Sequence, residues 1–89
     1  MKVSNMYSHN GNQVPNQFII DNGNKTIFQS YKTIVAVKEN GEITLDSNAL
    51  DYSATTTKYL KQFLNTSDSK KQLQDKIKSG FYQVADLNN

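Results

Sequence analysis

The sequence predicts an α+β fold in which an antiparallel β-sheet of three to five strands packs on one or two α-helices, as a single layer of helix on sheet. Asn-Gly pairs at residues 22–23 and 40–41 separate runs rich in β-branched residues, which is typical of β-hairpins. Residues 50–64 carry apolar side chains at the spacing of one helix face, so we expect a helix that covers the sheet. That face consists of Thr56, Tyr59, Leu60, Phe63 and Leu64.

The length of 89 residues fits a single domain over residues 1–89. We expect residues 1–14 to be a loose or edge segment, and residues 87–89 to be a frayed tail. A chain this short buries roughly 60–65% of its unfolded surface. Its five Tyr and four Phe side chains must therefore supply much of the core.

The charge and the missing residue types exclude several classes of protein. The sequence has no Cys, so it forms neither disulfides nor thiolate metal sites. The formal net charge is only +2 and every basic residue is Lys, which disfavours surfaces that read phosphates or bases with the Arg fork. The first residues lack the apolar run of a signal peptide, and no stretch is long enough to span a membrane. We therefore expect a cytoplasmic protein without a membrane partner.

The strands follow from the turn signals. Residues 17–21 and 26–31 are expected to form one hairpin, and residues 43–45 pair back after the second Asn-Gly turn. Residues 32–38 either continue the strand before them or form a separate one. Strict alternation would leave both sheet faces partly apolar, so we expect a β-bulge or a bend near Ser30-Tyr31 that shifts the phase.

The helices have recognisable start and stop signals. Ser53 or Asp51 is the expected N-cap of the first helix. Thr66 or Ser67 should cap a second helix, with Asp68 in its first turn. The second helix has a thin apolar stripe, formed by Leu73, Ile77 and Phe81, and should end near Ser79-Gly80. Residues 81–85 could follow it as a final strand paired to a free edge of the sheet.

Catalytic chemistry finds little support. The single histidine, His9, lies beside an Asn-Gly turn without a second His or a carboxylate cluster, so a solvent-exposed role is expected. Asp46 and Asp51 would need a dry pocket to act as an acid/base pair, and strand termination and helix capping explain both. We expect no enzyme, no catalytic residue, no metal and no cofactor.

Hydroxyl and lysine side chains gather at the start of the first helix, where free N–H groups attract anions. Ser53, Thr55, Lys58 and Lys61 are the candidate binding residues there. The alternative is that Ser53 only caps the helix and the others are solvated. Tyr31 is a further candidate as a stacking platform, although core packing is the alternative for a tyrosine in a strand.

Several segments over residues 10–87 resemble a family of small hypothetical proteins from tailed phages and mobile elements. Such proteins often have Trp just before the Asp-Tyr-Ser segment, and here that position is Leu50. The resemblance implies the setting of a phage accessory protein and carries no activity. The segments that carry it are Asn16-Gln17-Phe18-Ile19-Ile20, Phe28-Gln29-Ser30-Tyr31, Leu45-Asp46 and Asp51-Tyr52-Ser53-x-Thr55-Thr56-x-Lys58-Tyr59-Leu60-x-x-Phe63-Leu64.

We therefore expect a non-enzymatic accessory protein in the cytoplasm of an infected bacterial host. It would bind a host or phage protein. A more specific hypothesis is that this binding inhibits a host defence system. The first alternative is a nucleic-acid-binding module that uses Lys58, Lys61 and the Lys-rich second helix. The second alternative is a virion or assembly component that acts as a homo-oligomer.

Overall fold

A computed structural model describes residues 1–88 of the chain. Within these residues the chain forms six strands and two helices, which confirms the α+β class predicted from the sequence. The elements in chain order are β1 (Lys2–Tyr7), β2 (Gln13–Asp21), β3 (Lys25–Ser30), β4 (Thr33–Glu39), β5 (Glu42–Asp46), α1 (Ala54–Leu64), α2 (Lys70–Lys78) and β6 (Gln83–Ala85).

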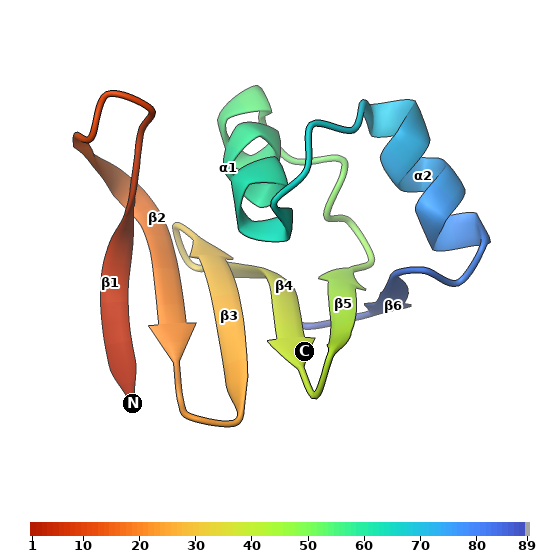
Figure 1. The fold of residues 1–89 in the computed structure, drawn as a ribbon, viewed down its shortest axis with the longest axis horizontal. Helices are drawn as coiled ribbons and strands as arrows, with labels where there is room; N and C mark the ends of the chain where they lie inside the picture. The colour runs from red at the N-terminus through yellow and green to blue at the C-terminus, as the bar shows by residue number, and fades with distance from the viewer. Residues whose placement is uncertain (89) are drawn as a thin grey trace.

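Over residues 1–88 the six strands lie in one sheet in the order of the sequence, from β1 at one edge to β6 at the other (Figure 1). Neighbouring pairs from β1 to β5 are antiparallel, whereas β6 returns after both helices and pairs parallel to β5. The expected range of three to five strands is too low by one, because both terminal segments add an edge strand. The second hairpin has the expected turn, since Asn40 and Gly41 both have positive φ.

The predicted bulge or bend near Ser30-Tyr31 corresponds to a register shift between Phe28 and Gln29 and a tight turn at Tyr31, but the extra residue of the bulge lies on β4. Phe28 pairs with Ala36 but the next residue, Gln29, pairs with Ile34, so Val35 is the extra residue of a bulge. Val35 and Ala36 are both fully buried as a result. Tyr31 is outside the strands, in the tight β3–β4 turn with φ of 55°, and residues 26–38 therefore form two strands.

Helix α1 covers the face of the sheet that carries Phe28 and Ser30 (Figure 1). The rings of Phe28 and Phe63 stack with centroids 5.8 Å apart. The hydroxyls of Ser30 and Thr56 form a buried hydrogen bond of 3.0 Å. The five residues of the predicted apolar stripe are all buried, which confirms the face of the helix. The helix starts at Ala54, because Ser53, one of the two predicted N-caps, has extended backbone and caps it; residues 50–53 lead into the helix.

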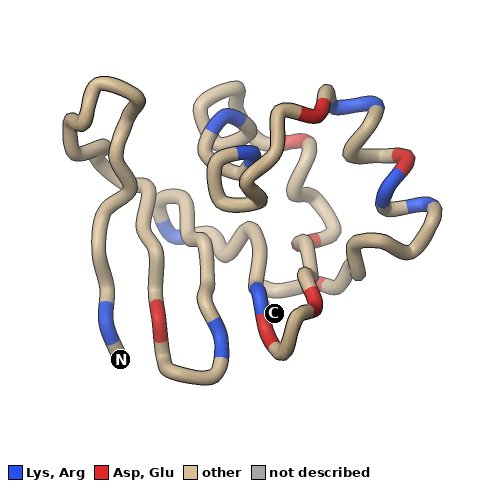
Figure 2. Tube along the Cα trace, in the orientation of Figure 1, with Lys and Arg blue, Asp and Glu red and all other residues tan. Residues whose placement is uncertain are grey.

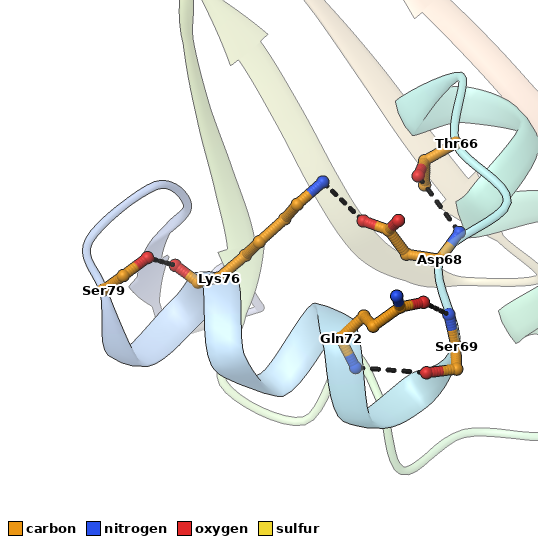
Figure 3. A network of polar contacts seen from close by, with 6 residues as sticks. All are labelled: Thr66, Asp68, Ser69, Gln72, Lys76 and Ser79. Carbon is orange, nitrogen blue, oxygen red and sulfur yellow. Dashed lines mark hydrogen bonds and ion pairs between the residues drawn. The ribbon is translucent and has the colours of Figure 1, made fainter.

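Helix α2 starts later than predicted. Its N-cap is Ser69, which forms a reciprocal capping box with Gln72, so the prediction of Thr66 or Ser67 is wrong (Figure 3). Asp68 precedes the helix and forms an ion pair with Lys76 of its last turn. Leu73 is fully buried, whereas Phe81 at the end of the expected stripe is 63% exposed and Tyr82 is buried beside it. The helix is therefore fixed to the core by Leu73 and the partly buried Ile77, and the chain that follows it by Tyr82.

Candidate binding groove

A groove of about 890 Å³ lies between the outer face of α1 and the loop that leads into α2. A smaller hollow, of about 380 Å³, lies beside Asp46 and the C-terminal segment. Residues from four parts of the chain line the larger hollow: His9 from the β1–β2 hairpin, Leu50, Tyr52 and Ala54 before and at the start of α1, Thr57, Lys58, Lys61 and Gln62 on α1, and Asn65, Thr66, Ser67 and Lys70 after it. We call this hollow the lysine groove.

The shape of the lysine groove follows from how α1 ends. Asn65 adopts the left-handed conformation with φ of 56°, and its N–H and that of Thr66 donate to the last carbonyls of the helix. The chain therefore turns back along α1 instead of leaving it. Because the apolar face of α1 packs on the sheet, Lys58 and Lys61 are left on the side that faces this returning loop.

The floor of the groove is apolar at Leu50 and Ala54, and is bounded by the ring of Tyr52. The Tyr52 hydroxyl donates to the buried carboxylate of Asp46 at 2.7 Å, which holds the ring in place. Burial, and then the hydrogen bond to Asp46, raise the pKa of Tyr52 from 10.0 to about 12. The tyrosine is therefore a neutral hydrogen-bond donor at physiological pH.

Positive charge dominates the rim of the groove. Three lysines line it, namely Lys58, Lys61 and Lys70, and no Asp or Glu from the described part of the chain does so. Figure 2 shows the basic positions of α1 and of the start of α2 in blue, with acidic positions close by in the connecting segments. Lys70 has a carboxylate partner, Asp51, at 3.8 Å, but both side chains are more than half exposed. Such a pair is weak, so its lysine stays accessible to a stronger partner.

The loop on the far side of the groove is held by polar contacts (Figure 3). The Thr66 hydroxyl accepts a hydrogen bond of 3.1 Å from the Asp68 N–H. The hydrogen bond from Lys76 is the main reason that the pKa of Asp68 is lowered, and it also raises the pKa of Lys76. Asp68 thus orders the loop, with Lys76 as the main partner of its charge and a weaker interaction with the groove lysine Lys61.

The structure brings together only part of the predicted site. Lys58 and Lys61 line the groove, whereas the exposed Thr55 is not among the lining residues. Ser53 also lies outside the groove, because its hydroxyl accepts from the Thr56 N–H at 3.2 Å as the N-cap. Tyr31 is in the β3–β4 turn and 59% exposed, so the alternative of core packing is wrong for it and it is no part of the groove.

Thr57, from the hydroxyl cluster at the start of the first helix, lines the groove with the predicted lysines, whereas sequence reasoning missed His9 and Lys70 as their neighbours. His9 is exposed in its turn as expected, yet it lines the groove. The Gln62 side chain donates to the Tyr7 carbonyl at 2.9 Å and so ties the hairpin to α1. Of His9 and Lys70, only Lys70 had a sequence signal for its position, because a helix that follows a short loop lies beside the helix before it.

The described residues provide no metal centre, since no cluster of three or more His, Cys, Asp or Glu side chains suited to a metal ion occurs in residues 1–88. None of the helices in that range has the length and apolar character needed to cross a membrane.

Residues 1–80 match the model of DUF8033, a family of unknown function. Neither a curated protein nor a solved structure matches the chain.

Proposed function

We propose that the chain, which belongs to DUF8033, a family of unknown function, is a non-enzymatic binding protein. It would act stoichiometrically on another protein. The observation that supports this most is the lysine groove, which joins three lysines to an apolar floor and has no Asp or Glu among its described lining residues. Its expected occupant is an acidic surface segment of the partner.

The chemistry of the groove suits a protein better than a nucleic acid. An acidic peptide offers separate carboxylates to the lysines and aliphatic or aromatic side chains to the floor at Leu50 and Ala54. A nucleic acid would be bound more effectively by guanidinium groups, and the sequence has no Arg. The lysines are expected to speed association with the acidic partner, an effect that salt screens.

We place this binding in the cytoplasm of an infected bacterium, with the chain as a phage accessory protein and its partner as a host or phage protein. Inhibition of a host defence system is the specific form that we propose, because a small stoichiometric protein acts by occupying a target. The phage setting depends on the resemblance of the Asn16–Ile20 and Asp51–Leu64 segments to small phage proteins.

The test is affinity capture of a partner from infected cells with three tagged chains. They are the unmodified chain, the groove variant Lys58→Glu/Lys61→Glu, and the matched control Lys71→Glu/Lys78→Glu on the exposed side of α2. Both variants change the net charge equally. We expect the unmodified chain and the control to recover the same protein, and the groove variant to lose it, with binding weakened at least about tenfold.

Equal recovery by the groove variant and the control would contradict the proposal. Recovery of nucleic acid instead of protein, with affinity that falls steeply as salt rises, would support the nucleic-acid alternative.

A further inference from the structure

The C-terminal segment, Gln83–Asn88, occupies the outer edge of the sheet. Its strand β6 pairs with β5 through Thr44, Leu45 and Asp46, and the Ser47 N–H continues the pairing by donating to the Ala85 carbonyl at 2.9 Å. Figure 1 shows the chain then passing behind β5 and β4 to its end. Residues 87 and 88, which belong to the segment expected to be a frayed tail, make specific hydrogen bonds there, and residue 89 lies outside the described residues.

The last described residue completes the backbone pairing of β4. The Asn88 side-chain oxygen accepts from the Ile34 N–H at 2.8 Å, and its amide nitrogen donates to the Ile34 carbonyl at 3.0 Å. This reciprocal pair is the arrangement that a residue of an adjacent strand makes with its backbone. The side chain of Asn88 thus substitutes for a strand at the point where β5 has turned away.

Asp46 is the second fixed point under this segment. It is only 3% exposed, and its carboxylate accepts from the Leu87 N–H at 3.0 Å and from the Asn88 amide at 3.1 Å. It also accepts from the Tyr52 hydroxyl and from the Asn48 N–H. A strand laid along β5 therefore meets a preformed row of backbone groups that ends in a buried carboxylate.

The segment that occupies this position is held with little apolar burial. All three residues of β6 are exposed, and the buried anchor Tyr82 comes just before them. The segment also lies beyond residues 1–80, which match the family model. Its attachment depends mainly on hydrogen bonds, and an equivalent strand from another molecule can make the same ones.

We propose that the β5 edge, together with Ile34 and Asp46, is a strand-accepting site, and that its occupant in trans is the Gln83–Asn88 segment of a second copy. An identical segment meets every requirement of the site: extended backbone parallel to β5, an N–H directed at Asp46 and a primary amide for Ile34. Reciprocal exchange of these segments would join two copies through the same contacts that each copy makes within itself. This proposal is independent of the lysine groove.

The test measures, by fluorescence anisotropy, how tightly the full chain binds a fluorescent peptide with the sequence of residues 81–89. The chain variant Asn88→Ala keeps the site but weakens its own occupant, so we expect it to bind the peptide about tenfold more tightly than the unmodified chain. The same substitution in the peptide should weaken binding about tenfold. No binding of the unmodified peptide by the folded Asn88→Ala chain would overturn the strand-accepting site.

Analytical ultracentrifugation of the full chain tests the identity of the occupant. We expect a dimer fraction that grows with concentration and that an excess of the unlabelled peptide dissociates, whereas the Asn88→Ala peptide does not. Peptide binding without any dimer would overturn the assignment of a second copy and leave a foreign strand as the ligand of the site.

Discussion

Asp46 shows how one buried carboxylate joins distant parts of a small chain. Burial alone would raise its pKa, but the hydrogen bonds that it accepts outweigh this effect and hold the pKa below the ordinary value of 3.8. Its donors come from the turn after β5, from the approach to α1 and from the C-terminal segment. The charge on this residue therefore stabilises the groove floor and the sheet edge together.

Asp46→Asn is expected to lower the free energy of unfolding at neutral pH by about 1–3 kcal/mol, because donors that face the carboxylate lose a charged acceptor. Since the folded pKa lies below that of the unfolded chain, the carboxylate contributes fully above the unfolded value of 3.8 and loses its contribution as the pH falls through the folded pKa. The difference in the free energy of unfolding between the variant and the unmodified chain should thus become smaller as the pH falls from about 5 to about 2. Urea unfolding at both pH values measures it, with the exposed Asp75→Asn as the control; a difference that does not change with pH would contradict this explanation.

Individual site residues were only partly predictable from the sequence. Helical spacing places Lys58 and Lys61 opposite the apolar stripe, and this was enough to select them. The spacing does not say that Ser53 is fully used as a cap, because Asp51 was an equally good candidate. His9 carries no local signal at all, since its place in the groove depends on how the β1–β2 hairpin leans on α1.

At the scale of elements, local chemistry predicts turns and apolar faces better than boundaries. The Asn40-Gly41 turn and the buried face of α1 were both predicted, because each depends on residues close in sequence. The bulge or bend near Ser30-Tyr31 was predicted in position, but the sequence did not show that its extra residue, Val35, lies on β4, since the register of β4 is decided by its partner β3 and by the tight turn at Tyr31. The start of α2 was misplaced because Thr66, Ser67 and Ser69 are all capping residue types, and it is the capping box of Ser69 with Gln72 that decides between them.

Helix α1 is fixed to the sheet by a polar contact as well as by its apolar face. Thr56→Val keeps the shape of the side chain but leaves the buried Ser30 hydroxyl without this partner. We expect the free energy of unfolding to fall by about 1–3 kcal/mol. Thr55→Val, at the exposed neighbouring position, should change it by less than about 0.5 kcal/mol. Thermal or urea unfolding of both variants measures the difference, and equal effects would show that the Ser30–Thr56 contact does not stabilise the packing of α1.

The lysine groove is a property of the whole molecule. It needs α1 on the sheet, the left-handed turn at Asn65, the loop held by Asp68 and the hairpin that carries His9. These segments are far apart in the sequence, so no single sequence motif identifies the site. The same arrangement separates the groove from the exposed lysines of α2, Lys71 and Lys78, which provide an internal control for charge alone.

The most direct test of the groove is an NMR titration of the labelled full chain with an oligoglutamate peptide. We expect the largest amide shift changes at Thr57, Lys58 and Lys61 and in residues 66–70, with reversal by high salt. The Lys58→Glu/Lys61→Glu variant should lose these changes and Lys71→Glu/Lys78→Glu should keep them. Changes centred on α2, or none in the groove of the unmodified chain, would contradict the account.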